Sequence, residues 1–410
     1  MLTHRVVITG AGAYSPIGND WDEIERNLRG LNSGVRHIEA WDEYDGLNTK
    51  LGAPVPNFEM PPSFNRKRTR SMGRVAMLAT AASEKALRDA GLLDDPVLKS
   101  GRVGVAYGSS TGSTDAITDF ANMLLTKTLN GITATTYIRM MGHTTPVNIG
   151  VFFRLQGRVI TTSSACTSGS QGIGYAYEAI RNGAQDIMLA GGAEELCPTE
   201  AAVFDTLYAT STRNDQPEKS SRPFDRDRDG LVIGEGACTL ILERRDHALA
   251  RGAKIYAEIV GFDTNADGAH VTQPSPETMQ RVLEMALANA NLSPDAIGYV
   301  SAHGTATDRG DIAESLATRR VLGESTPISS IKSYMGHTLG ACGALESWLS
   351  IEMMNNGWFA PTINLDNVDP GCATLDYIRG DGRDLDVEYV MNNNFAFGGI
   401  NTSLIFRRHS

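Results

Sequence analysis

Three separated segments of the sequence each place a reactive side chain directly after a short apolar stretch. Cys166 follows the first stretch, His303 follows the second, and Lys332 and His337 follow the third. A cysteine thiol is a nucleophile, and histidine side chains are donors or bases near physiological pH. One cysteine with two histidines therefore suits acyl transfer through a thioester.

The small residues after Cys166 favour a reactive thiol. A helix is predicted over residues 168–182, which places Cys166 at its N-terminus. The unpaired N–H groups and the dipole of a helix N-terminus favour a thiolate over a thiol. The glycines and serines also allow an acyl group to approach the backbone, where N–H groups could hold a developing oxyanion.

Other interpretations of these residues stay open at this point. A lone cysteine before a small-residue helix is usually a buried, inert residue, and a lone histidine after a strand is usually structural. A Cys–His hydrolase is a further candidate. Zinc bound by one cysteine and two histidines is conceivable, but no close ligand pair in the sequence supports it.

The elements that must position these residues alternate between strands and helices, which predicts α/β layers. Strand ends in such a protein share one rim, where residues far apart in sequence converge. We expect strands at residues 5–9, 102–107, 158–162, 186–190, 238–243, 255–261, 298–302 and 328–331, and helices at 73–90, 168–182, 277–290 and 311–322. The best boundary lies near residues 244–254, and it predicts two similar halves, 1–250 and 251–410, although no clean sequence repeat is visible.

Composition excludes several classes of protein. The 410 residues include 48 acids against 37 bases, a net charge of −11, which argues against a non-specific nucleic-acid binder. No apolar run approaches the ~18 residues of a membrane span. The five cysteines form no CxxC pair, which predicts a reducing, cytoplasmic setting without a disulfide framework or a zinc site.

Two motifs suggest ligands that their details do not support. Gly10-Ala11-Gly12 follows a strand as a dinucleotide fingerprint would, but Ser15 replaces the third glycine, so we expect a tight strand-to-loop turn. Residues 225–230 resemble the start of a calcium loop, but Gly236 stands where the bidentate glutamate should be. We expect a structural turn rich in charge pairs there.

Taken together, the motifs of the chain resemble those of the elongating β-ketoacyl-[acyl-carrier-protein] synthases, the synthase I/II type of the thiolase superfamily. The resemblance extends from residue 5 to residue 406. A cysteine with two histidines resembles this elongating type, whereas the initiating type pairs cysteine with histidine and asparagine. The motifs are SSACTSG at 163–169, AGGAEE at 190–195, STRND at 211–215, RPFDRDRDGLVIGEGA at 222–237, AHGT at 302–305, KSYMGHTLGACGALES at 332–347 and PTINLDN at 361–367.

The resemblance implies an α/β protein with the thiolase fold, in which two similar halves make a five-layered α-β-α-β-α arrangement. It implies an acyltransferase that needs no cofactor and no metal ion. The expected reaction is a decarboxylative Claisen condensation of an acyl-carrier-protein thioester with malonyl-carrier protein, which extends the chain by two carbons. A homodimer is expected, and a heterodimer with a paralogue is possible.

The resemblance also implies roles for individual residues. Cys166 would take the acyl chain, and His303 and His337 would assist malonyl decarboxylation and stabilise the enolate. Lys332 would order the histidines, and Glu346 would be its buried acid partner. A cation near the site favours anions, and a carboxylate pairs with it.

A second group of residues would support these catalytic residues. The backbone N–H groups of Cys166 and Phe397 resemble the family's oxyanion hole, and Phe397 also stands where the family has a gating phenylalanine. Phe395, Thr305 and Thr307 are expected to support the site.

Four positions depart from the family pattern. Ala396 replaces the usual glycine, Ile400 the usual threonine, and Asp308 the common proline. A Cβ at position 396 restricts the backbone, so we expect slower or altered gating. Thr111 replaces a larger apolar residue that often limits the acyl pocket. Chain length, saturation and pathway, whether housekeeping fatty-acid or specialised polyene synthesis, therefore stay open.

The negative charge of the chain is unevenly distributed. Residues 60–83 contain no acid, but residues 66–74 contain five bases. A solvated helix start would also explain them. Lys67, Arg70 and Arg213 match family positions that contact the acidic carrier protein, which predicts a docking patch.

Two further interpretations compete with an active condensing enzyme. A non-catalytic partner subunit that resembles a chain-length factor would share the fold but lack the nucleophile, whereas this chain has Cys166 with His303, His337 and Lys332. A thiolase that uses coenzyme A lacks support, because its cysteine and histidine set differs.

Overall fold

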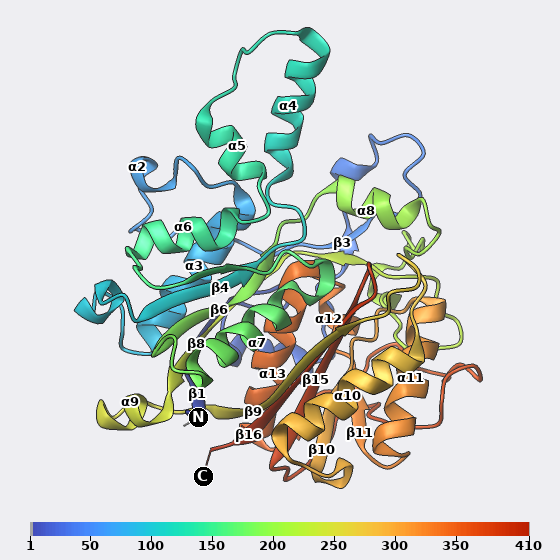
Figure 1. The fold of residues 1–410 in the computed structure, drawn as a ribbon. Helices are drawn as coiled ribbons and strands as arrows, with labels where there is room; N and C mark the ends of the chain where they lie inside the picture. The colour runs from blue at the N-terminus through green and yellow to red at the C-terminus, as the bar shows by residue number, and fades with distance from the viewer. Residues whose placement is uncertain (1–2, 410) are drawn as a thin grey trace.

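The structure, a computed structural model, describes residues 3–409 and is built on one eleven-stranded sheet (Figure 1). The strand order is β13-β11-β10-β15-β16-β9-β1-β8-β6-β4-β5. The first half of the chain supplies β1 (Val6–Tyr14), β4 (Val103–Gly108), β5 (Val159–Thr161), β6 (Ile187–Glu194) and β8 (Gly236–Arg244). The second half supplies β9 (Ala257–Ala266), β10 (Ile297–Ser301), β11 (Pro327–Ser329), β13 (Asp376–Tyr377), β15 (Tyr389–Ala396) and β16 (Ile400–Arg408).

Two helices lie between the two halves of this sheet. α7 (Ser168–Arg181) packs on β4, β6 and β8 on one side and on β9 and β16 on the other, and α13 (Cys342–Asn356) lies beside it. α3 (Arg74–Asp89) and α6 (Thr144–Phe153) cover the outer face of the first half. α10 (Pro276–Ala290) and α11 (Asp308–Leu322) cover the outer face of the second half (Figure 1). The expected α-β-α-β-α layers are confirmed.

The strands are apolar on both faces because helices cover both faces. On β8, Leu240 and Leu242 point into the core around α7 and α13, whereas Ile241 between them joins the core under α3. Alternate residues of one strand thus hold two layers together. The strands therefore appear as continuous apolar runs in the sequence.

The expected turn at Gly10-Ala11-Gly12 is wrong, because β1 continues through both glycines to Tyr14. A Cβ at Gly12 would lie 2.3 Å from the carbonyl oxygen of Ala82 in α3. The glycines are needed for the close approach of strand and helix, not for a turn. The other expected strands and helices are present, with ends that differ by a few residues.

Several elements were not expected from the sequence. α4 (Thr114–Thr126) and α5 (Ala134–Met140) form an arm that projects from the body, in teal in Figure 1. Leu125 is 80% exposed and Leu129 is 74% exposed on this arm. The remaining elements are α1 (Trp21–Arg29), α2 (Arg66–Thr69), α8 (Pro198–Asp205), α9 (Arg245–Ala250), α12 (Lys332–Met335), β2 (Arg36–His37), β3 (Leu51–Ala53), β7 (Ile233–Gly234), β12 (Trp358–Phe359) and β14 (Arg383–Asp384).

Residues 225–230 form the structural turn that we expected. The Asp225 carboxylate accepts hydrogen bonds from the backbone N–H groups of Asp227, Asp366 and Asn367, each at 2.8 Å. Arg222 also donates to Asp225, at 3.1 Å. The turn therefore connects the first half of the chain to residues near 366 through hydrogen bonds.

Among residues 3–409, no helix is long and apolar enough to cross a membrane.

Candidate active site

Cys166 lies in a single 3₁₀ turn, Ala165–Thr167, between β5 and α7. Ala165 before it has a φ of 50°, a left-handed conformation that few non-glycine residues adopt. Such strained positions cluster at functional sites. Sγ of Cys166 is buried and lies 2.9 Å from Nε2 of His337.

The two histidines enter the same space from different segments. His303 follows β10, and its backbone N–H donates to Glu314 in α11 at 2.7 Å. His337 follows α12, and its backbone N–H donates to the carbonyl of Val232 at 2.7 Å. Their ring centroids are 5.2 Å apart and the rings are perpendicular. Segments that follow β5, β10 and α12 therefore bring Cys166, His303 and His337 together, as the sequence predicts.

A buried ion pair lies behind His303. Lys332, the first residue of α12, donates to Glu346 in α13, and both side chains are almost completely buried. Nζ of Lys332 also lies 3.3 Å from Nδ1 of His303. The structure thus brings Lys332 and Glu346 to the site, with Lys332 beside one histidine.

Burial sets the protonation state of the three reactive side chains. It raises the pKa of the Cys166 thiol to about 12, although Lys332 and the backbone N–H groups of Phe397 and Cys166 oppose this rise. Burial and the cation of Lys332 lower the pKa of His303 and of His337 well below the ordinary value of 6.5. All three groups are therefore neutral at physiological pH.

The expected resting thiolate is therefore wrong. Cys166 does precede a helix, but its sulfur is buried, and desolvation of the anion outweighs the effect of the helix N-terminus. The thiol can still ionise by passing its proton to Nε2 of His337 at 2.9 Å. The pair then acts as a nucleophile with its own base.

Burial alone lowers the pKa of Lys332, but Cys342 and Glu346 outweigh it and raise this pKa above its ordinary value. Lys332 is therefore an ammonium group, which donates hydrogen bonds and accepts none. It favours negative charge that develops in the site.

A cavity of about 530 Å³ leads to Cys166 and the two histidines. The expected supporting residues Phe395, Phe397, Thr305 and Thr307 all line it. The Phe397 ring is 4.9 Å from that of Phe204 in α8, between centroids. The backbone N–H groups of Phe397 and Cys166 lower the pKa of the thiol, and such groups are suited to hold an oxyanion on a bound acyl group.

The departures at 396, 400 and 308 fit the backbone without strain. Ala396 ends β15 and pairs with Ile400 at the start of β16, so its Cβ sits on an ordinary strand. The two residues with a left-handed backbone in this hairpin are Gly398 and Gly399, with φ of 87° and 68°. Asp308 begins α11, where an acidic residue, like proline, suits the first turn of a helix.

The structure also brings together a possible set of metal ligands. Cys166 Sγ and one nitrogen each from His303 and His337 lie within 4.8 Å of one another, which the sequence spacing did not reveal. These are zinc-type donors. The ammonium group of Lys332, 3.3 Å from Nδ1 of His303, opposes a divalent cation there. The arrangement fits proton transfer better than metal binding.

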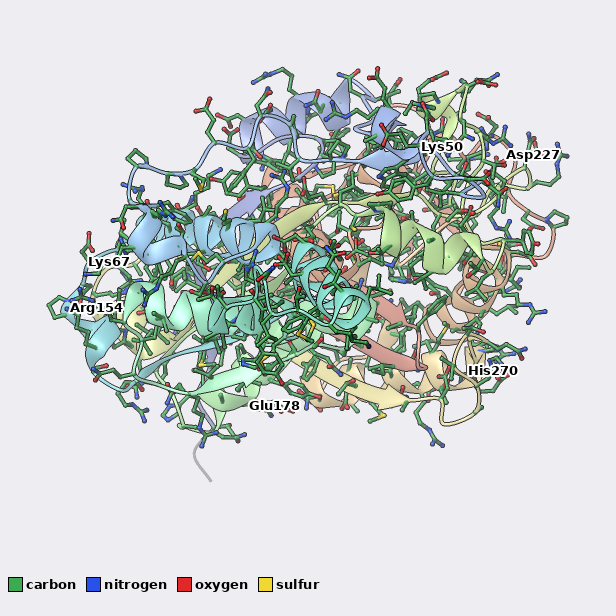
Figure 2. All side chains as sticks on the ribbon, turned by 90° about the horizontal axis from the view of Figure 1, so that it is seen from above. Lys50, Lys67, Arg154, Glu178, Asp227 and His270 are labelled. Atoms are coloured by element: carbon green, nitrogen blue, oxygen red, sulfur yellow. The ribbon has the colours of Figure 1, made fainter. Side chains whose placement is uncertain are left out.

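The predicted docking and acyl-pocket residues do not meet at this cavity in one chain. Lys67 lies at one end of the molecule and Asp227 at the other (Figure 2). Arg213 lies at the Asp227 end, because its guanidinium donates to the carbonyl of Asp227 at 2.6 Å. Lys67 and Arg70 are exposed, and Thr111 is exposed in the loop after β4 and does not line the cavity.

Two buried residues at the site were not singled out in the sequence. Glu314 accepts hydrogen bonds from the backbone N–H groups of His303 and Gly304, each at 2.7 Å, and burial raises its pKa to about 8. Asn394 in β15 contacts both His303 and Glu346. The one available signal for Asn394 was the run of three consecutive asparagines just before Phe395.

The chain resembles known proteins over its whole length. The family model described as "Beta-ketoacyl synthase, N-terminal domain" matches residues 3–248, and the one described as "Beta-ketoacyl synthase, C-terminal domain" matches residues 256–366. The chain is 39% identical over 420 aligned positions to the 3-oxoacyl-[acyl-carrier-protein] synthase 2 of Vibrio cholerae serotype O1, and the alignment covers 100% of both.

Solved structures agree with these matches. A β-ketoacyl synthase from Burkholderia phymatum STM815 superposes with a TM-score of 0.98 at 60% identity, and covers 99% of this chain and 100% of its own. A ketosynthase solved with its type II polyketide acyl-carrier protein superposes with a TM-score of 0.88 at 33% identity, and covers 99% of this chain and 100% of its own.

Proposed function

The chain belongs to the β-ketoacyl synthase family, and from this premise we propose that it elongates acyl chains by decarboxylative condensation with malonyl-carrier protein. It is an acyltransferase of the condensing type. The observation that best supports the proposal is the neutral Cys166–His337 pair beside a second neutral histidine that lies next to a buried cation.

In the first half-reaction, the thiol of Cys166 attacks the carbonyl of the acyl thioester while its proton passes to Nε2 of His337. The backbone N–H groups of Cys166 and Phe397 stabilise the oxyanion. Collapse of the tetrahedral intermediate leaves an acyl-Cys166 thioester. The departing thiolate of the carrier takes the proton back from His337, so this histidine ends neutral.

In the second half-reaction, the malonyl group of malonyl-carrier protein occupies the cavity that Thr305 and Thr307 line. Loss of carbon dioxide leaves an enolate, whose oxygen accepts a hydrogen bond from His303. The enolate carbon attacks the acyl-Cys166 thioester, and the carbon–sulfur bond breaks. The thiolate of Cys166 takes a proton from solvent, because the condensation consumes one proton overall, and the β-ketoacyl product, two carbons longer, leaves on the carrier.

The cation of Lys332 favours this second step. Its ammonium group contacts His303 and is paired with Glu346. The pair holds a positive charge close to the developing enolate and adds no net charge to the resting site. The alternative of a non-catalytic partner subunit gains no support, since nucleophile, histidines and lysine converge in one cavity.

We also propose that the functional unit is a dimer, with a second copy of this chain as the simplest partner. The α4–α5 arm exposes Leu124, Leu125 and Leu129, which a monomer would leave in water. Light scattering on the purified chain tests this. A dimer that Leu125→Glu with Leu129→Glu converts to a monomer supports the proposal.

The proposed carrier-docking residues lie at opposite ends of one chain. Lys67 is at one end, with Arg70 at the end of the same helix α2, and Arg213 is at the other end beside Asp227. A carrier protein could contact both groups only across two subunits. Lys67 and Arg70 remain exposed, whereas the nearby Arg74 is engaged by Glu235.

All five cysteines are free and buried, which agrees with a protein that functions in a reducing, cytoplasmic compartment.

An elongation assay tests the proposed function. The purified chain is incubated with malonyl-carrier protein and with acyl-carrier substrates that differ in length and include saturated, unsaturated and polyenoic chains. Mass spectrometry of the carrier should show a β-ketoacyl product. Absence of product with every substrate, from protein whose circular dichroism shows a folded state, would contradict the proposal.

A further inference from the structure

The side chain of Asn394 lies at the junction of His303 and the Lys332–Glu346 ion pair, and the function proposed above gives it no role. Asn394 is completely buried in β15. Its Nδ2 donates to Oε2 of Glu346 at 2.7 Å and lies 3.4 Å from Nδ1 of His303. One amide group thus contacts both a catalytic histidine and the carboxylate that holds Lys332.

The neighbours of the amide fix its orientation. Its Oδ1 accepts a hydrogen bond from Nδ2 of Asn392 at 3.2 Å. A flipped amide would place that oxygen against the carboxylate of Glu346, where two acceptors would repel each other. The NH₂ group therefore faces Glu346 and His303, and its two hydrogens serve one of them each.

Nδ1 of His303 consequently faces two donors and no proton of its own fits between them. The ammonium of Lys332 lies 3.3 Å away on one side and the amide of Asn394 lies 3.4 Å away on the other. A ring nitrogen that faces donors is the acceptor of the neutral imidazole. The proton of His303 is therefore on Nε2, the nitrogen away from Lys332 and Asn394.

We propose that Asn394 is a positioning residue, whose amide holds His303 in the Nε2–H tautomer and keeps Lys332 shared between His303 and Glu346. This inference rests on the proposed function, in which Nε2–H donates to the enolate oxygen. The opposite tautomer would present a lone pair to that oxygen and repel it. Loss of the amide would also leave Oε2 of Glu346 without its donor, so that Glu346 would draw Lys332 away from His303.

The variant Asn394→Asp keeps the shape of the side chain and replaces the donor with a titratable group. The titratable groups that face position 394 are His303, Lys332, Glu346 and Cys342, and Glu314 lies behind His303. As a carboxylate, the new group accepts the proton of Nδ1 and reverses the tautomer. As a carboxylic acid, it has one O–H in place of the two N–H groups of the amide, so it restores part of the donation.

Two activities of the Asn394→Asp variant are then measured separately. One is release of carbon dioxide from malonyl-carrier protein, and the other is acyl transfer to Cys166. Decarboxylation should fall roughly 100-fold at pH 8, the size of effect that loss of one donor to a developing oxyanion produces, and should recover at least about tenfold at pH 6. Acyl transfer should stay within about threefold of the native rate, because it uses His337.

Matched control variants separate position from general damage. Asn393 is the preceding residue of the same strand, is equally buried, and has no hydrogen bond from its side chain within residues 3–409. Asn394→Leu should lower decarboxylation without recovery at low pH, and Asn393→Leu should leave it unchanged. Equal losses in both leucine variants, or a native decarboxylation rate of Asn394→Asp at both pH values, would overturn the inference.

A measurement on the native protein covers the case in which the variants do not fold. Nitrogen-15 spectra of histidine-labelled protein distinguish the two neutral tautomers, and the His303 signals are assigned by their loss in His303→Gln. The proton is expected on Nε2, and a proton on Nδ1 would overturn the inference. If native protein failed to condense any substrate, the proposed function would fail, while this tautomer would still test the arrangement around Asn394.

Discussion

The two histidines of the site are held in opposite ways, although they lie side by side. Nε2 of His337 is 2.9 Å from the sulfur of Cys166, and its Nδ1 has no hydrogen-bond partner within residues 3–409. Nδ1 of His303 instead lies 3.3 Å from the ammonium of Lys332. One ring is therefore placed to accept a proton from a thiol, and the other is placed to donate one.

This difference arises from the hydrogen-bond partners of the two rings and not from the charge of the rings themselves. Burial and Lys332 lower the pKa of both rings, so both begin neutral. Neutral imidazole has one donor and one acceptor nitrogen, and the partner of one nitrogen decides the role of the other. Two identical side chains thus acquire the two functions that a two-step acyl transfer needs.

Removal of the nucleophile should give the largest effect and should leave only the decarboxylation that His303 supports. Cys166→Ala should lower condensation by on the order of 10⁴-fold, because no thioester can form. Decarboxylation of malonyl-carrier protein should continue, because His303 and Lys332 are untouched. Product mass and release of carbon dioxide measure the two activities, and light scattering should show the same oligomeric state as the native protein. Full elongation by this variant would refute the assignment.

Removal of each histidine in turn should then separate the role of His337 in acyl transfer from the role of His303 in decarboxylation. His303→Ala should lower decarboxylation roughly 100- to 1,000-fold, as loss of one oxyanion donor does, and should leave acyl transfer to Cys166 within about threefold. His337→Ala, in contrast, should lower acyl transfer to Cys166, because the thiol loses its base. Single-turnover loading with labelled acyl-carrier protein measures the first step. Identical profiles for the two variants would show that the difference in contacts has no chemical consequence.

The pH dependence of alkylation should sharpen the description of the Cys166 side. With the pKa of Cys166 at about 12, the thiolate fraction grows with pH throughout the working range. The rate of iodoacetamide modification should therefore rise about tenfold per pH unit between pH 7 and 10. Peptide mass spectrometry identifies the modified residue, and Cys166→Ala gives the background. A plateau already at pH 8 would indicate a thiolate in the resting protein.

Charge reversal at the proposed docking residues should give the smallest effect and should change acyl transfer and decarboxylation alike. Acyl and malonyl groups reach the same cavity on the same carrier. Lys67→Glu with Arg70→Glu should therefore raise KM for both carrier-borne substrates by a similar factor, about three- to tenfold, and should flatten its dependence on salt. Asp45→Lys, an exposed change outside the patch, is the control. Unchanged KM and salt dependence would mark residues 66–70 as a solvated surface.

The sequence predicts the members of the site more completely than their state. Cys166, His303 and Lys332 each follow a strand, which is the pattern that the sequence shows. Cys166 follows β5 at one end of the sheet, whereas His303 and Lys332 follow β10 and β11 near the other end, and the turn that holds Cys166 packs against β15. The pKa of Cys166 could not be predicted this way, because local sequence shows the helix N-terminus but not the depth of burial. The misassigned glycines have the same cause, since the helix that packs on Gly12 starts 62 residues later.

Asn394 and Glu314 were missed for a different reason. The amide of Asn394 acts through Glu346 and His303, which lie in distant segments, and the carboxylate of Glu314 acts through the backbone of the loop that precedes its own helix. Neither residue has a local pattern that indicates a reactive group. Such supporting residues become visible when the packing of α11, α13 and β15 around His303 is known.

The buried, neutral state of the Cys166 thiol has a consequence for the durability of the protein. Peroxide oxidises thiolates far faster than thiols, and an oxidised sulfur cannot form a thioester. A nucleophile that stays protonated until a substrate carbonyl is in place therefore resists sulfenic acid formation between turnovers. Burial keeps the sulfur protonated while the cavity is empty, and His337 is placed to take the proton once a substrate carbonyl is bound.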